Sequence, residues 1–246
     1  MPITHERGYL IPAINTADID YVACANCLAD NIRQFHPKAN ITILTKEMLP
    51  YGDHGGYAND WQCFAASPYR ETIKLEADMW CASSIDHWWT LFEHRDVVIS
   101  QGCRDFYDNP SQSRFYRKLF DNNNLPDVYN AITYWRVSQT AKEFFNLVHT
   151  IFNQWDEYKT ILKFPDELPT TDVVYGMAAV IMGPERVTLP AGIGPTIVHM
   201  KKHIISTSTD QWIDELIYEH NDTGIKINTV AQWGLVHYHN KDIKYD

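Results

Sequence analysis

Two acidic residues that could bind a metal ion follow a short apolar segment near the first third of the chain. The segment reads Thr72-Ile-Lys-Leu-Glu-Ala-Asp-Met-Trp80, in which one residue separates Glu76 from Asp78. In an extended backbone, side chains two residues apart point to the same side, so these carboxylates can converge on one point. Converging carboxylates repel each other unless a cation joins them. The spacing therefore favours a Mg²⁺ or Mn²⁺ site, although a solvated acidic pair at the start of a loop is the common alternative.

A divalent ion at this position could also hold a diphosphate and neutralise the charge on a departing nucleoside diphosphate. Two cationic residues, Arg70 and Lys74, precede the acidic pair, and a cation near a diphosphate helps to bind it. Lys74 alternates with apolar neighbours and is expected on the same strand face as Glu76. An ordinary ion pair between Lys74 and Glu76 or Asp78 explains its presence equally well.

The elements that must position these residues have the order of an α/β protein. Strand-like and helix-like segments alternate, which predicts a single, mostly parallel mixed sheet flanked by helices. In such sheets ligands bind beyond the carboxyl ends of the strands, where the acidic pair is expected. The expected strands are 8–14, 41–45, 72–75, 97–100, 131–135, 196–200 and 234–238. The expected helices are 20–35, a short one after Ser83 or Ser84, 138–158, 171–182 and 211–220, whereas 46–59 is expected to be a loop and 101–125 has no clear period.

Length and composition fit one globular domain over residues 1–246, since 45% of the residues are hydrophobic and 21% are charged. No apolar stretch is long enough to cross a bilayer, and the first residues lack a signal-peptide pattern. We therefore expect no membrane span and a cytoplasmic location. The formal net charge of −10 disfavours contact with nucleic acid or anionic lipid unless a local basic patch intervenes.

The segment Ile73-Lys-Leu-Glu-Ala-Asp-Met79 resembles the strand-plus-acidic motif of the glycogenin-like nucleotide-sugar glycosyltransferases, a superfamily with the GT-A fold. The family motif is usually Asp-x-Asp, and this chain has Glu at the first position. The chain is also similar to phage-encoded members of the superfamily. Further similarities follow the family's order over roughly residues 8–241, namely Ile11-Pro-Ala-Ile-Asn-Thr16, Val128-Tyr-Asn-Ala-Ile-Thr-Tyr-Trp135 and Thr171-Asp172.

The resemblance implies a single GT-A domain that transfers a sugar from a nucleotide-diphosphate sugar to an acceptor hydroxyl. It implies retention of the anomeric configuration and a Mn²⁺ or Mg²⁺ ion bound by Glu76 and Asp78. The acceptor is left open and could be a glycan, a protein or a modified DNA base. If a phage encodes the chain, the expected location becomes the host cytoplasm.

The resemblance also assigns roles to residues near the expected sheet edge. Asn15 and Thr16 lie in the family's nucleotide-binding first turn, Asn130 stands where an Asn contacts the sugar, and Asp172 opens the acidic helix that faces the sugar or the anomeric carbon. Tyr21 could stack on the base, as aromatic rings often do. Helix-face packing of Tyr21 and attraction of Asp172 to a helix N-terminus are the structural alternatives.

The third metal ligand in the family is a His near the C-terminus, often with a Lys nearby for the diphosphate. Two segments of this chain fit, one containing His199 and the other containing His237 followed by Lys241. We favour His237, with Lys241 as a diphosphate ligand, because His-Tyr followed by a Lys is closer to the family pattern. An imidazole together with two carboxylates suits Mn²⁺.

Two further functions stay open beside this one. A phage glycosyltransferase acting on modified DNA bases would need a basic patch, for which Arg114, Arg117 and Lys118 are the candidates, against the overall acidic charge. A catalytically silent module that binds nucleotide sugars would keep the fold without the activity.

Overall fold

The structure is a computed structural model that describes residues 2–109, 117–190, 193–195, 197–199, 217–221 and 224–238. A central sheet of five strands has the order β2-β1-β3-β6-β5. Its strands are β1 (His5–Pro12), β2 (Ile41–Leu44), β3 (Tyr69–Leu75), β5 (Val97–Gln101) and β6 (Val128–Arg136). β1 pairs in parallel with β2 and β3, whereas β6 runs antiparallel to both β3 and β5. The central sheet is therefore mixed, as predicted: four of its strands run in one direction and β6 runs against them. The expected strands 196–200 and 234–238 lie outside it, in a separate sheet.

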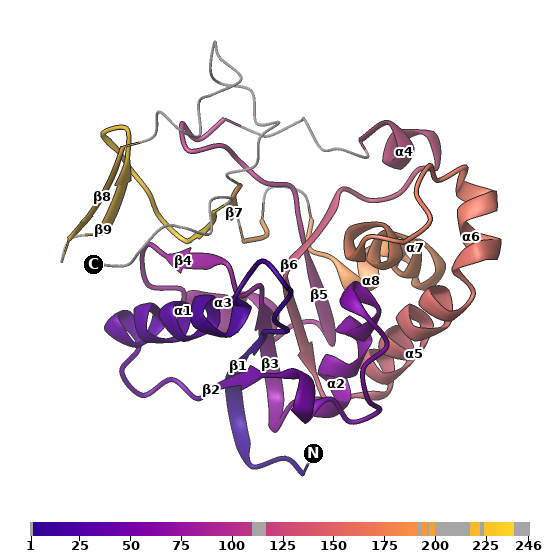
Figure 1. Ribbon diagram of the computed structural model, residues 1–246, viewed down its shortest axis with the longest axis horizontal. Helices are drawn as coiled ribbons and strands as arrows, with labels where there is room; N and C mark the ends of the chain where they lie inside the picture. The colour runs from indigo at the N-terminus through magenta and orange to yellow at the C-terminus, as the bar shows by residue number, and fades with distance from the viewer. Residues whose placement is uncertain are drawn as a thin grey trace.

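Helices cover both faces of this sheet (Figure 1). The larger helices are α1 (Tyr21–Phe35), α5 (Gln139–Asn153), α6 (Trp155–Leu162) and α7 (Thr171–Met182). Shorter ones are α2 (Cys63–Ala66), α3 (His87–Phe92), α4 (Arg117–Asn122), α8 (Pro184–Val187) and the 3₁₀ helices η1 (Lys46–Met48) and η2 (Gly56–Gln62). α1 and α3 lie on one face, and α2, α5 and α7 lie on the other. The chain thus has the three-layer arrangement of an α/β protein.

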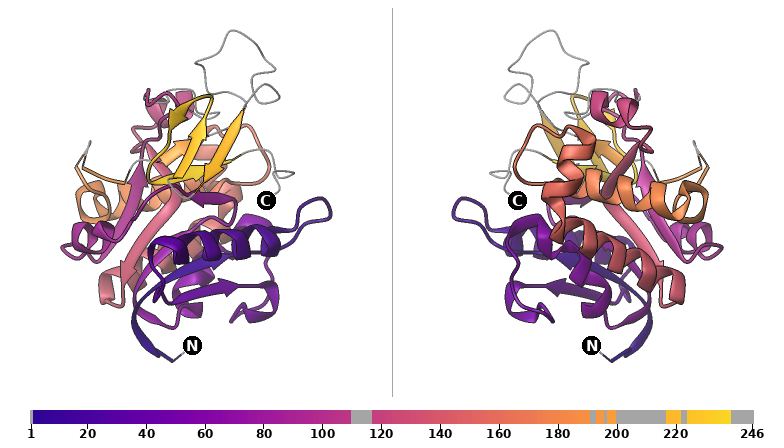
Figure 2. Two further views of the ribbon diagram at one scale, coloured as in Figure 1. Left: turned by 90° about the vertical axis from the view of Figure 1, so that its left-hand side faces the viewer. Right: turned by 90° about the vertical axis from the view of Figure 1, so that its right-hand side faces the viewer.

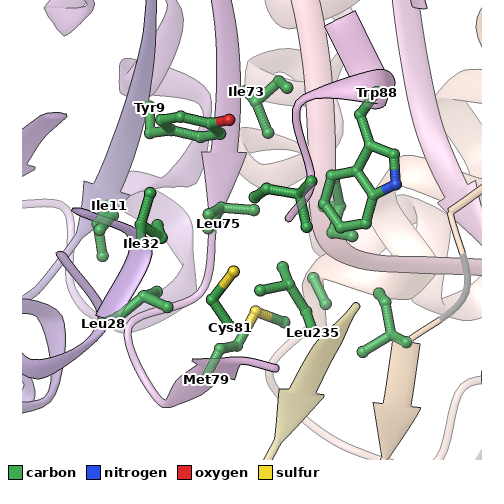
Figure 3. Close-up of a cluster of buried hydrophobic side chains, with 14 of the residues drawn as sticks. Tyr9, Ile11, Leu28, Ile32, Ile73, Leu75, Met79, Cys81, Trp88 and Leu235 are labelled. Carbon is green, nitrogen blue, oxygen red and sulfur yellow. The ribbon is translucent and has the colours of Figure 1, made fainter. Parts of the chain in front are cut away.

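Alternation along the strands assigns side chains to two separate hydrophobic cores. Ile73 and Leu75 of β3 pack with α1 and α3 (Figure 3), whereas Leu10 of β1 joins the core formed by α5 and α7. Gly8 allows the close approach of Tyr69 on the neighbouring strand, because a Cβ at Gly8 would lie 2.3 Å from the Tyr69 ring. Both faces of the sheet are therefore covered by a hydrophobic core, so that a ligand can bind only at an edge of the sheet.

Two three-stranded sheets complete the part of the chain that the structure describes (Figure 2). One has the order β4-β11-β7, formed by β4 (Met79–Cys81), β11 (Leu235–His237) and β7 (Ile197–His199). The other has the order β10-β9-β8, formed by β10 (Val230–Ala231), β9 (Gly224–Ile227) and β8 (Tyr218–Asn221). A third hydrophobic cluster joins residues of both sheets, including Trp80, Val198, Ile227 and Val236. β7, β9 and β11 are thereby packed against Trp80, which lies just after the end of β3.

The structure corrects several expected elements. The expected helix 138–158 is two helices, because Gln154 between α5 and α6 has the non-helical angles φ −107° and ψ 27°. The expected helix 211–220 is wrong where the structure describes it, since β8 begins at Tyr218. Residues 211–216 lie outside the described part. The expected loop 46–59 contains η1 and the start of η2, and α4 lies in the segment 101–125.

Among the described residues, the helices are all too short or too polar to cross a membrane.

Candidate metal centre

Glu76 and Asp78 lie in the connection between β3 and β4, at the carboxyl end of β3. β4 pairs antiparallel with β11, and in this register Met79 lies opposite His237. The pairing brings His237 beside the two acidic residues, although about two thirds of the chain separates them in sequence. In addition, the backbone N–H of Tyr238 donates to the carbonyl oxygen of Asp78 at 3.2 Å. The third residue of the site is thus positioned by backbone pairing.

The three side chains converge closely. His237 Nδ1 lies 3.3 Å from Glu76 Oε2, and His237 Nε2 lies 3.1 Å from Asp78 Oδ2. The side chains of Asp78 and His237 are 11% and 6% exposed, whereas that of Glu76 is 33% exposed. One potential ligand atom from each lies within 4.8 Å of the others. The site is therefore walled by protein and open on the side of Glu76.

This set of atoms fits a divalent cation. Ligands at about 2.2 Å from an ion lie at most about 4.4 Å apart, so small rotations of these side chains would bring all three into coordination. Two carboxylates close together need a positive partner. An imidazole nitrogen beside two carboxylates suits Mn²⁺ better than Mg²⁺, which prefers oxygen ligands alone.

Tyr129 in β6 supports the imidazole from the other side. Its hydroxyl forms a hydrogen bond with Nδ1 of His237, which leaves Nε2 on the side of Asp78. Burial raises the pKa of the Tyr129 hydroxyl well above its ordinary value, and the charge of Glu76 adds to the effect. The hydroxyl therefore stays protonated. Partners of this kind fix the ring orientation of a metal-binding histidine.

The competing histidine lies in the neighbouring strand. β7 pairs in parallel with β11, and His199 lies opposite His237 in that register. The side chain of His199 is outside the described part of the structure, as is the whole of Lys241. Among the described residues, His237 is the histidine that joins the acidic pair.

Several solved glycosyltransferase structures are similar to this chain. A bifunctional glycosyltransferase, WbbM, superposes with a TM-score of 0.53 at 11% identity, over 96% of this chain and 46% of the other. Mouse xyloside xylosyltransferase 1 gives 0.49 at 9% identity, over 95% and 97% of the two chains. Galactosyltransferase LgtC, in complex with donor and acceptor sugar analogs, gives 0.47 at 12% identity, over 95% and 87%. The chain has the GT-A glycosyltransferase fold. No protein-family model and no curated protein sequence matches it.

The first turn of this GT-A fold is built by residues that we expected to bind the nucleotide. Oδ1 of Asn15 accepts the backbone N–H of Val22 at 2.9 Å, and Oγ1 of Thr16 accepts that of Ile19 at 3.1 Å. Tyr21 follows as the first residue of α1 and is half-buried. Burial raises the pKa of its hydroxyl to about 12, and the nearby charge of Asp78 contributes. The stacking of Tyr21 on a base stays a prediction.

The two cationic residues before the acidic pair are placed differently from our expectation. Arg70 lies near the start of β3, at the opposite end of the strand, where its Nε lies 3.1 Å from Glu6. This position removes Arg70 from the candidate diphosphate ligands. Lys74 is 2% exposed and its ammonium lies 2.7 Å from Asp60, so neither expected ion pair, with Glu76 or with Asp78, is its main contact.

Asn130 links the expected sugar-binding residues instead of standing free. Its backbone N–H donates to Asp172 Oδ1 at 2.7 Å, and its Nδ2 donates to Asp60 Oδ2 at 3.2 Å. Its Oδ1 accepts the hydroxyl of Thr133, and the side chain as a whole is 1% exposed. Asn130 therefore contacts the carboxylates of both Asp60 and Asp172, and its expected contact with a sugar stays a prediction.

Two residues of the site, Tyr129 and Asp60, were not predicted from the sequence. Tyr129 stands next to Asn130 in the same motif, so its position offered a signal that we did not use. Asp60 directly follows the segment 46–59, which was expected to be a loop. The sequence spacing between Asp60 and Lys74 gives no indication that the two side chains form an ion pair. The hydroxyl of Tyr175 in α7 also donates to Asp60, which shows that the contact depends on the folding of three separate elements.

Proposed function

We propose that the chain is a metal-dependent glycosyltransferase that takes a sugar from a nucleotide-diphosphate sugar and transfers it to an acceptor hydroxyl. The observation that carries the proposal is the convergence of Glu76, Asp78 and His237 at the carboxyl end of β3. In open α/β sheets this edge is where ligands bind. The likeness of the fold to a solved glycosyltransferase supports the same reading.

Each residue at this edge has a proposed task. Glu76, Asp78 and His237 hold the cation, which supplies positive charge to the diphosphate and to the leaving nucleoside diphosphate. Tyr129 orients His237. Asn15, Thr16 and Tyr21 form the nucleotide side of the site, and Lys241 is a proposed diphosphate ligand from outside the described residues.

Asp172 faces the sugar in this proposal. It lies in the first turn of α7, where Thr170 caps the helix by accepting the backbone N–H of Val173. Asn130 holds one of its oxygens, so the carboxylate is oriented before substrate arrives. Such preorganisation positions the anomeric carbon against the acceptor and avoids reorganisation during the reaction. Retention of configuration follows from the resemblance to glycogenin-like enzymes.

The decisive experiment compares wild type with Asp78→Asn. We expect wild type to hydrolyse or transfer the sugar of at least one nucleotide-diphosphate sugar in a Mn²⁺-dependent reaction, measured by release of nucleoside diphosphate. The Asn side chain keeps the size but loses the charge needed to hold the cation, so release should fall to background while the circular dichroism spectrum stays unchanged. Wild-type-like turnover by the variant would contradict the proposed site, and the absence of turnover in both proteins would favour a silent binding module.

A further inference from the structure

The three proposed metal ligands are divided between two sheets. The backbone N–H of Glu76 donates to the carbonyl oxygen of Ala131 in β6 at 3.2 Å, so Glu76 continues the pairing of the central sheet. Asp78 is joined to the small sheet β4-β11-β7, because its carbonyl oxygen accepts the N–H of Tyr238, and His237 lies in β11 of that sheet. One residue separates the two acidic ligands. The distances among the ligand atoms therefore depend on how the small sheet is placed against the central one.

In the part of the chain that the structure describes, β4 lies at the edge of the small sheet. The N–H of Ala82 donates to the carbonyl oxygen of Gly234, next to β11, at 2.8 Å. Residues of an antiparallel strand alternate between those that bond to the partner strand and those whose N–H points away from it. The N–H of Cys81 therefore points away from β11. Cys81 is 1% exposed, and a buried N–H without an acceptor is costly, so this strand needs an acceptor from outside its sheet.

Asn31 of α1 supplies that acceptor. Its Oδ1 accepts the N–H of Cys81, and the Asn31 side chain is itself buried. The same helix packs on the central sheet, since Leu28 and Ile32 of α1 share a hydrophobic core with Ile73 of β3 (Figure 3). Asn31 therefore attaches the edge of the small sheet to a helix that belongs to the central layers.

We propose that Asn31 is a positioning residue for the metal centre, which holds Asp78 and His237 at the distance from Glu76 that one cation requires. The inference rests on the proposed function and adds a residue from an element that carries none of the three ligands. Apolar contacts permit small shifts of a strand, whereas a hydrogen bond to its backbone is directional. Ligands that are already in place bind a metal more tightly, because less ordering accompanies binding.

A Mn²⁺ titration of Asn31→Leu tests the proposal. The substitution keeps a side chain branched at Cγ but removes the accepting oxygen, so the N–H of Cys81 loses its partner. We expect Mn²⁺ binding, measured by isothermal titration calorimetry, to weaken about tenfold. The titration is made at a temperature at which circular dichroism shows the variant to be folded. Asn31→Ala adds no volume to the core and should give the same result where Asn31→Leu does not fold.

Two control variants separate positioning from a general loss of stability. Asn26→Leu makes the same chemical change on the same helix, at an exposed residue whose Nδ2 donates to Val22 within α1. Val148→Ala removes buried volume from the core on the other face of the sheet and lowers stability there. Both controls should bind Mn²⁺ like wild type. If Val148→Ala weakens binding as much as Asn31→Leu for the same loss in free energy of unfolding, Asn31 has no specific role at the metal centre.

Amide hydrogen exchange gives a second readout, and its first part needs no variant. A cation that joins the two sheets opposes their separation, so Mn²⁺ should slow exchange of the Cys81 amide in wild type. Without Mn²⁺, that amide should exchange faster in Asn31→Leu than in wild type. Exchange of the Cys81 amide that does not respond to bound Mn²⁺ would contradict the coupling between this contact and the metal centre.

The outcomes separate this inference from the proposed function. If wild type binds Mn²⁺ and Asp78→Asn loses the binding, but Asn31→Leu keeps the wild-type affinity, the positioning role is refuted and the metal site stands. If wild type does not bind Mn²⁺, or if Asp78→Asn binds it equally well, the proposed metal site is overturned together with this inference.

Discussion

At the scale of single residues, the site depends on side chains whose orientation is fixed by hydrogen bonds. The two carboxylates could be found from the sequence because their spacing, one residue apart after a strand, has a direct geometric meaning. His237 followed from a resemblance. Tyr129 and Asp60 did not emerge, because a hydrogen bond between residues distant in sequence leaves no spacing to read. Charged residues that lie close together in the sequence are thus easier to predict than the distant residues that form hydrogen bonds with the site.

Tyr129→Phe tests the support of the imidazole. The substitution removes the hydroxyl that contacts His237 Nδ1 while keeping the ring in the core. Loss of such a partner typically weakens metal binding by about 10–100-fold, and we expect that range in a Mn²⁺ titration. Tyr134→Phe, on the same strand, is the control, since the buried Tyr134 hydroxyl has no hydrogen-bond partner among the described residues. Equal Mn²⁺ affinity in the two variants would argue against a role for Tyr129.

At the scale of elements, periodicity predicted the helices and strands that pack in the central layers. Segments with irregular composition were predicted poorly, because their structure comes from tertiary contacts. η2 is the clearest case: Trp61 stacks on His149 of α5 at 3.8 Å, and Asp60 binds Lys74 of β3. β8 was mistaken for a helix, since its pairing with β9 overrides the local pattern.

The helix α1 offers a test of a local signal. Asp20 caps it by accepting the backbone N–H of Ala23 at 3.0 Å. Asp20→Ala leaves that N–H without its partner and should lower the free energy of unfolding by about 1 kcal/mol. Urea denaturation followed by circular dichroism measures the change. Asp20→Asn keeps an accepting oxygen and should recover most of the loss; if both variants match wild type, the cap does not contribute to stability.

The contact between η2 and α5 should make stability depend on pH. Burial lowers the pKa of His149, and the charge of His54 lowers it further. In the unfolded chain the pKa of His149 is near 6.5. Between that pH and the lower pKa of the folded state, the unfolded chain therefore binds more protons at this residue than the folded chain does. The contribution of His149 to the free energy of unfolding is therefore complete above about pH 6.5, and it is lost as the pH falls toward the pKa of His149 in the folded state.

His149→Phe checks this dependence because it keeps an aromatic ring against Trp61 but cannot be protonated. We expect the urea midpoint of the variant to fall less than that of wild type between about pH 7.5 and about pH 5.5. His94→Phe, at an exposed position, serves as the comparison and should keep the wild-type dependence. A wild-type slope in His149→Phe would show that the contact does not couple folding to protonation.

At the scale of the whole molecule, the candidate metal centre joins the first half of the chain to its C-terminal strand. Glu76 and Asp78 follow β3, whereas His237 ends β11. The mixed order of the central sheet was predicted only in outline, because the reversal of β6 depends on how distant segments pair. A cation at this junction would add to the β4-β11 pairing and the hydrophobic cluster that already join these parts.

Mn²⁺ should therefore stabilise the folded chain as a whole. A ligand that binds only the native state at 100 times its Kd adds about 2.7 kcal/mol, which for a chain of this size raises Tm by roughly 5–10 °C. Differential scanning calorimetry with Mn²⁺ or with a chelator measures the shift. Asp78→Asn should lose most of it, because one of the three ligand side chains no longer carries charge. A full shift in that variant would mean that the ion stabilises the chain from another site.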